Sequence, residues 1–119
     1  MQTAGPRLAF VKLNVPEMGA ALAFWRDGFG LDVAQTFDEP EFLEHILALP
    51  GEAGGPNLLL VQYKDGRDVT CGKGHGPVGF SCDDIESSHA RALAAGAVAL
   101  TGVFDVGPVK VAMLQSPQS

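Results

Sequence analysis

Long hydrophobic runs are missing from this 119-residue sequence: no apolar stretch approaches the ~18 residues that a membrane-spanning helix needs. The N-terminal MQTAGPRLAF also lacks the basic and then apolar order of a secretory signal. No segment is rich in lysine or arginine, and the formal net charge is −6. These absences argue against nucleic acid and membranes as partners, because both attract clustered cations. We therefore expect a cytoplasmic protein.

Cysteine is scarce. Cys71 and Cys82 are the only two, and their spacing matches no metal site. We expect both to stay reduced, with Cys82 as a small core residue in an apolar strand. No serine sits in a G-x-S-x-G turn, so no nucleophile is indicated. The remaining composition, 46% hydrophobic and 18% charged, predicts one globular domain over residues 1–119.

Hydrophobic periodicity and turn residues predict the secondary structure. Apolar residues at helical spacing follow the first strand and predict a helix. Pro16 suits the first position of this helix, and Gly30 suits its end. Asp84 is a good N-cap for a second helix, which Gly96 ends. The expected elements are a strand at 10–15, a helix at 16–29, strands at 31–37, 42–50 and 57–64, a strand at 77–82, a helix at 85–95, and strands at 97–105 and 107–115.

The two halves of the chain repeat the same order of elements. Placing Leu13 on Phe80 also superimposes the turn that opens each helix. Such self-similarity predicts a duplicated module rather than a solenoid, since two units are too few for an array. We expect repeats over about 7–66 and about 76–119, the second of them without its last strand in this sequence.

The stretches FVKLNVPEMGAALAFWRDGFGLDV and VGFSCDDIESSHARALAAGA, one from each half, resemble the vicinal oxygen chelate superfamily. This group includes glyoxalase I, bleomycin-resistance proteins and extradiol dioxygenases. The resemblance implies an α+β fold in which two βαβββ modules form an open, cup-shaped curved sheet with the helices outside. It also implies a small-molecule ligand and a homodimer.

In that fold, one face of the first strand lines the cup, together with one face of strand 57–64. Lys12 there predicts a carboxylate or another anion as ligand, and Tyr63 could donate a hydrogen bond or stack. The alternatives are that Lys12 and Asn14 are solvated at the rim and that Tyr63 only supports it. The expected ligand-binding residues are Phe10, Lys12, Asn14, Leu59, Val61 and Tyr63.

Members of the superfamily that do metal chemistry carry His, Glu or Gln ligands at positions that hold Phe10, Leu59 (or its neighbour) and Pro77 here. None of these side chains can bind a metal ion. We therefore expect no metal and no other cofactor at the usual positions.

A displaced divalent metal site remains an alternative, built from Glu44, His45 and His75. Glu44 and His45 are neighbours on a strand, however, and point to opposite faces. His45 is also the candidate catalytic base, although a histidine with such apolar neighbours is more often a packed or interfacial residue with a satisfied hydrogen bond. Lys110 is a further cation for an anionic ligand, or a solvated residue at a sheet edge.

Two functions follow. The first is a glyoxalase-like or bleomycin-resistance-like protein that binds a small organic molecule without a metal, which requires no catalytic group. The second is an enzyme, a lyase or isomerase of the lactoylglutathione-lyase type or a dioxygenase-like protein, with a displaced metal site or His45 as base.

Overall fold

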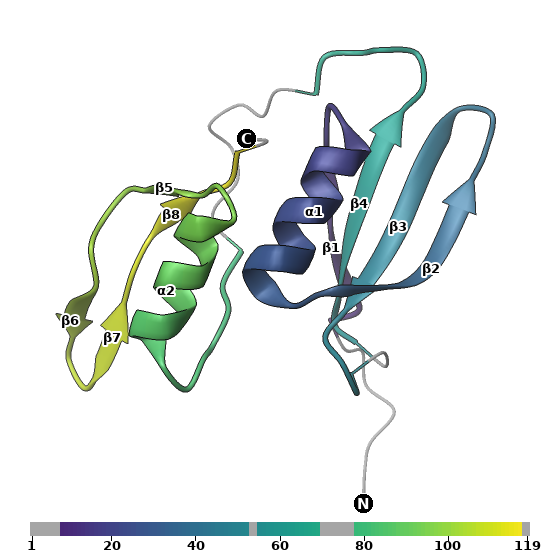
Figure 1. Cartoon of the computed structure of the whole chain (residues 1–119). Coiled ribbons are helices and arrows are strands. Elements are labelled where there is room, and N and C mark those ends of the chain that lie inside the picture. Colours follow the sequence, from purple (N-terminus) through teal and green to yellow (C-terminus); the bar gives the residue numbers. More distant parts are fainter. Residues whose placement is uncertain (1–7, 53–54, 70–77, 118–119) are drawn as a thin grey trace, which may run out of the picture.

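The structure is a computed structural model and describes residues 8–52, 55–69 and 78–117. Two helices and eight strands make up this part of the chain (Figure 1). They are β1 (Phe10–Asn14), α1 (Met18–Phe29), β2 (Asp32–Asp38), β3 (Phe42–Ala48), β4 (Asn57–Tyr63), α2 (Ile85–Ala94), β5 (Val98–Ala99), β6 (Phe104–Val106), β7 (Val109–Val111) and β8 (Leu114–Gln115). The α+β composition is confirmed, whereas the cup of two βαβββ modules stays a prediction.

The first four strands form one sheet in the order β1-β4-β3-β2. β1 runs parallel to β4, and the other neighbours are antiparallel. α1 covers one face of this sheet (Figure 1), and the core lies between them. It joins Met18, Ala21 and Trp25 of α1 to Leu47 of β3 and Leu60 of β4. The apolar stripe of the helix is therefore the side that packs on the sheet.

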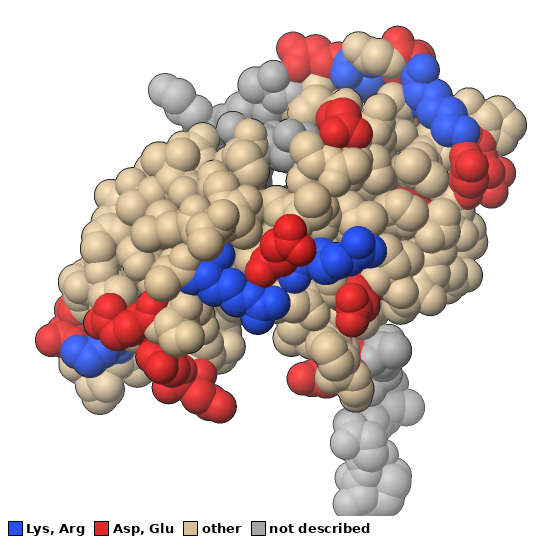
Figure 2. All heavy atoms as spheres, viewed as in Figure 1, with Lys and Arg blue, Asp and Glu red and all other residues tan. Residues whose placement is uncertain are grey.

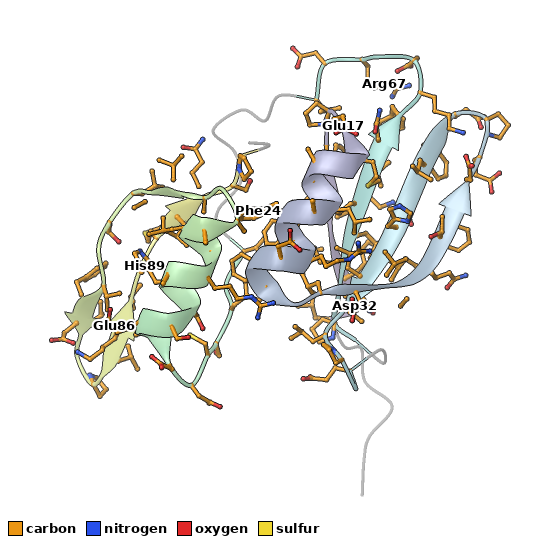
Figure 3. All side chains as sticks on the ribbon, viewed as in Figure 1. Glu17, Phe24, Asp32, Arg67, Glu86 and His89 are labelled. Carbon is orange, nitrogen blue, oxygen red and sulfur yellow. The ribbon has the colours of Figure 1, made fainter. Side chains whose placement is uncertain are left out.

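Glu17 caps the first helix. Its carboxylate oxygens accept hydrogen bonds from two backbone N–H groups of the first turn, at 2.7 and 2.9 Å. Figure 3 shows Glu17 at this end of α1. The side-chain oxygen of Gln62, on β4, accepts the N–H of Met18 at 2.6 Å. The expectation that Pro16 is the first helical residue is wrong, because the cap at Glu17 starts the helix at Met18.

The second helix lies against the first (Figure 1). The contact is close at Gly28, where an added Cβ would lie 3.2 Å from the Cβ of Ala95. Nε of Arg91, on α2, donates a hydrogen bond of 2.7 Å to the backbone oxygen of Asp27. The two halves of the chain thus meet through their helices.

The strand expected at 77–82 does not form over the described residues 78–82, so this expectation is wrong. Within the described part of the chain, β1 pairs only with β4, and the second half holds no counterpart of β4. Without that neighbour, the segment has no ladder to join. Phe80 still holds it against α1, since its ring stacks on Phe29 with centroids 4.6 Å apart. Cys82 is exposed and is not the core residue that was expected.

The strands expected at 97–105 and 107–115 pair with each other but are interrupted in the middle. β5 pairs with β8, and β6 pairs with β7. Between these pairs, the backbone N–H groups of Leu100 and Thr101 both donate to the carbonyl of Met113, at 2.9 and 3.1 Å. Two donors on one acceptor break the regular ladder, as a bulge does, and leave two short pairs instead of one long one.

Candidate functional site

The candidate site is the face of the first sheet that is turned away from α1, called the open face below. Residues paired in a ladder point to the same side, so the register assigns them. Leu58 and Leu60 belong to the core under α1, and their neighbours on β4 therefore point the other way. The structure brings together on this open face all six residues predicted to bind a ligand: Phe10, Lys12, Asn14, Leu59, Val61 and Tyr63. Their contact with a ligand stays a prediction.

An ion pair crosses the centre of the open face. Nζ of Lys12, on β1, lies 3.2 Å from Oε1 of Glu44, on β3, and β4 runs between them. Strands two places apart are separated by about 10 Å, so both side chains must lean over β4 to meet. This arrangement explains why Leu59 and Val61 are only 5% and 2% exposed although they lie outside the core under α1. The Lys12–Glu44 pair thus covers the apolar side chains of Leu59 and Val61.

Glu44 is the site residue that the sequence prediction missed, except as part of a displaced metal site. Its side chain is 12% exposed, against 43% for Lys12. One signal was available, since alternation places Glu44 on the same side of its strand as Ile46, among apolar neighbours. A carboxylate in such surroundings needs a partner. The sequence does not predict how β1, β4 and β3 align, and this alignment is what brings Lys12 to Glu44.

His45 lies on the other side of the sheet. In the ladder it pairs with Leu60, whose side chain is in the core. Its Nδ1 lies 2.9 Å from the hydroxyl oxygen of Thr36. The structure thus separates His45 from the open face. A catalytic role for His45 stays a prediction, and it would not involve the open face. His75 lies outside the described residues.

A divalent metal at the positions that the resemblance indicates does not fit the atoms present. Phe10 and Leu59 offer no ligand atom, and Pro77 lies outside the described residues. Over the described ranges, no three side chains of His, Cys, Asp or Glu gather in a way that could hold an ion. We therefore derive no chemical step through a metal.

A depression of about 250 Å³ lies beyond the end of β4 and is lined by Pro40, Glu41, Lys64, Asp65 and Arg67. The two cations in it already have partners, since Lys64 pairs with Asp38 and Arg67 with Asp65. The guanidinium of Arg67, labelled in Figure 3, also lies 4.0 Å from the ring centroid of Tyr63. The depression contains none of the six predicted ligand-binding residues, and its cations are neutralised.

The Asp65–Arg67 pair predicts a measurable pKa. Hydrogen bonds from the side chain and then the backbone N–H of Arg67 lower the pKa of Asp65 from 3.8 to about 2. Because the folded-state pKa is depressed, the stabilising effect is complete above about pH 4 and is lost as the pH falls towards 2. A carboxyl ¹³C NMR titration should show this pKa, and Arg67→Met should return it to the ordinary range. An unchanged value in the variant would contradict the assignment.

The other charged groups are dispersed. On the face shown in Figure 2, lysine and arginine side chains lie beside acidic ones rather than in one basic field. Lys110, a candidate cation from the sequence, pairs with Asp105 at 3.0 Å on the β6–β7 hairpin, and both are exposed. Neither helix in the described part of the chain is long and apolar enough to span a bilayer.

A mixed sheet covered by one helix, followed by a second helix and short paired strands, places the protein among mixed α+β folds of the glyoxalase kind. The family model for the Glyoxalase/Bleomycin resistance protein/Dioxygenase superfamily matches residues 7–114. The chain therefore belongs to this superfamily, and the resemblance seen in the sequence is confirmed. No curated protein matches the sequence.

Three solved structures show the same fold at low sequence identity. Glyoxalase I from Zea mays superimposes with a TM-score of 0.85 at 17% identity, covering 94% of this chain and 41% of the maize chain. A glyoxalase/bleomycin resistance protein/dioxygenase domain from Frankia sp. EAN1pec gives 0.77 at 15% identity, covering 97% and 92%. An antibiotic-binding protein from Streptomyces sp. CB03234 gives 0.69 at 18% identity, covering 98% and 92%. The chain thus spans less than half the length of the maize enzyme.

Proposed function

We propose that this protein binds a small organic molecule on the open face of its first sheet, within a cup that the curved sheets form. The observation that carries the proposal is the ion pair between Lys12 and Glu44 above the buried Leu59 and Val61. Ligand sites commonly combine a mostly apolar lining with a few converging polar groups. The Streptomyces protein with the same fold is itself an antibiotic-binding protein.

We propose further that binding uses no metal at the family's usual positions. The support is the chemistry of Phe10 and Leu59, which have no ligating atom. The lyase or isomerase alternative has less support, since its candidate base, His45, lies on the other side of the sheet.

The test is an NMR titration of the ¹⁵N-labelled protein with a panel of small aromatic acids, amines and amides. We expect dissociation constants on the order of 1 mM for fragments of this size. Saturable shifts should concentrate in the backbone amides of β1, β3 and β4. The proposal fails if no probe shifts these amides, or if all shifts cluster around Arg67 in the depression.

A second measurement tests the role of metals. The purified protein is analysed for bound elements and then titrated with nickel, zinc, manganese and iron(II) while its melting temperature is followed. A stoichiometric metal, or a saturable rise in melting temperature, would contradict metal-free binding, because an ion that binds the folded state stabilises it. That result would also favour the alternative function, a metal-dependent lyase or isomerase.

We also propose that the protein is a homodimer, with the β6–β7 hairpin in the interface. One face of this hairpin is entirely apolar and includes Val106 and Val109, which are 50% and 55% exposed. The other face carries the Asp105–Lys110 pair. An apolar face of this kind is stabilised by burial against a matching surface, and a second copy supplies one by symmetry.

Analytical ultracentrifugation at micromolar concentration should show that the wild-type protein is a dimer. The double variant Val106→Lys and Val109→Lys should be a monomer. The matched control is Asp105→Asn together with Lys110→Met, which alters the opposite face of the same hairpin and should leave the dimer intact. A monomeric wild-type protein would contradict the proposal, as would a dimer that the lysine variant does not affect.

A further inference from the structure

Considered alone, Lys12 predicts an anionic ligand. The structure changes this expectation, because Glu44 lies 3.2 Å away and cancels the charge of Lys12. A carboxylate that approaches the lysine must also approach the glutamate, and like charges at such distances repel each other. The centre of the open face therefore offers a donor and an acceptor side by side, with no net charge.

The carboxylate of Glu44 is also incompletely satisfied. Lys12 is its only partner in the described part of the chain, and the contact uses Oε1. The side chain of Glu44 keeps 12% of its surface exposed, so a ligand on the open face can reach it. A carboxylate can accept several hydrogen bonds, and this one has capacity left for a ligand. Likewise, Nζ of Lys12 has donors beyond the one directed at Glu44.

Apolar contact is available next to this pair. The ring of Phe10 lies 5.9 Å from Nζ of Lys12, and Phe10 is exposed on the same face. On β4, Leu59 pairs with Lys12 on one side and with Ile46 on the other, so Ile46 lies on the same face as the lysine. A ligand that meets both charged groups can therefore place an aromatic or aliphatic part on these side chains.

We propose that the open face selects a ligand with no net charge that carries a hydrogen-bond donor and an acceptor side by side, as an amide or an amino-acid zwitterion does, joined to an apolar group. Glu44 is the residue that sets this specificity, since it rejects simple anions and receives the donor. The inference rests on the proposed function and adds the class of ligand to it.

Four probes that share a phenyl ring test the inference: 3-phenylpropionate, 2-phenylethylamine, 3-phenylpropanamide and phenylalanine. Their dissociation constants are measured by NMR titration of the intact protein. We expect the amide or the zwitterion to bind the wild-type protein at least about threefold more tightly than either singly charged probe. Binding of the amide without the zwitterion, or the reverse, identifies which source of the donor–acceptor pair fits.

Two variants separate the roles of the charges. Glu44→Gln keeps the shape of the side chain and leaves Lys12 unopposed, so 3-phenylpropionate should bind about fivefold more tightly than to wild type. Lys12→Met should instead favour 2-phenylethylamine by a similar factor. The matched control is Asp105→Asn together with Lys110→Met, which removes an exposed pair of the same charges on the β6–β7 hairpin. It should leave the order of the four probes unchanged.

The outcomes distinguish the inference from the function beneath it. If 3-phenylpropionate binds wild type best and Glu44→Gln does not change its affinity, the inference is overturned while ligand binding on the open face stands. If no probe shifts the amides of β1, β3 and β4, the proposed function fails, and the inference fails with it. A preserved NMR fingerprint in Lys12→Met provides a folded variant even where Glu44→Gln is destabilised.

Discussion

Replacing Leu60 by alanine is expected to lower the free energy of unfolding by about 3–4 kcal/mol. Leu60 has no exposed surface and lies in the core between the first sheet and α1. Truncation of such a residue loses the transfer free energy of the removed atoms and leaves a cavity that rigid neighbours cannot fill. Urea denaturation followed by circular dichroism measures the effect.

Leu59→Ala is the matched comparison, because it makes the same change one residue earlier, on the opposite face of the same strand. Its cover is the Lys12–Glu44 pair, whose long side chains can settle into the space. We expect a loss of about 1–2 kcal/mol, mostly the transfer term. Equal losses in the two variants would show that the open face is packed as tightly as the core. That result would argue against a ligand site there.

The sequence predicts the first half well because its signals are local. The helical stripe, the turn residues and the apolar runs of strands 42–50 and 57–64 all act within a few residues. Alternation also groups the six ligand-binding candidates correctly on one face. This grouping requires only that side chains alternate between the two sides of a strand and that β1 pairs with β4.

Two features depend on pairing between distant residues, and the sequence does not predict them. Residues 78–82 have the alternation of a strand, yet a strand exists only when a neighbour completes its hydrogen bonds, and the described residues provide none. Similarly, Glu44 becomes a site residue only because the register sets Lys12 opposite it, across β4. In both cases tertiary pairing, rather than the local pattern, decides the outcome.

Gly28→Leu is expected to lower the free energy of unfolding by about 3 kcal/mol, although leucine is the better helix former by about 1 kcal/mol. The reason is the joint between the helices, where even a Cβ at this position would lie 3.2 Å from the Cβ of Ala95. A leucine must push α2 away from α1. That movement also strains the hydrogen bond from Arg91 to the backbone of Asp27.

The only tryptophan reports on this joint, because the ring of Trp25 stacks on Phe80 with centroids 6.0 Å apart. In Gly28→Leu we expect its native emission to shift to longer wavelength, in parallel with a lower urea midpoint. Ala23→Leu is the control, since it enlarges an exposed position of the same helix and should change stability by less than about 0.5 kcal/mol. If both variants behave alike, the helices do not meet at Gly28, and the two halves of the chain are joined in another way.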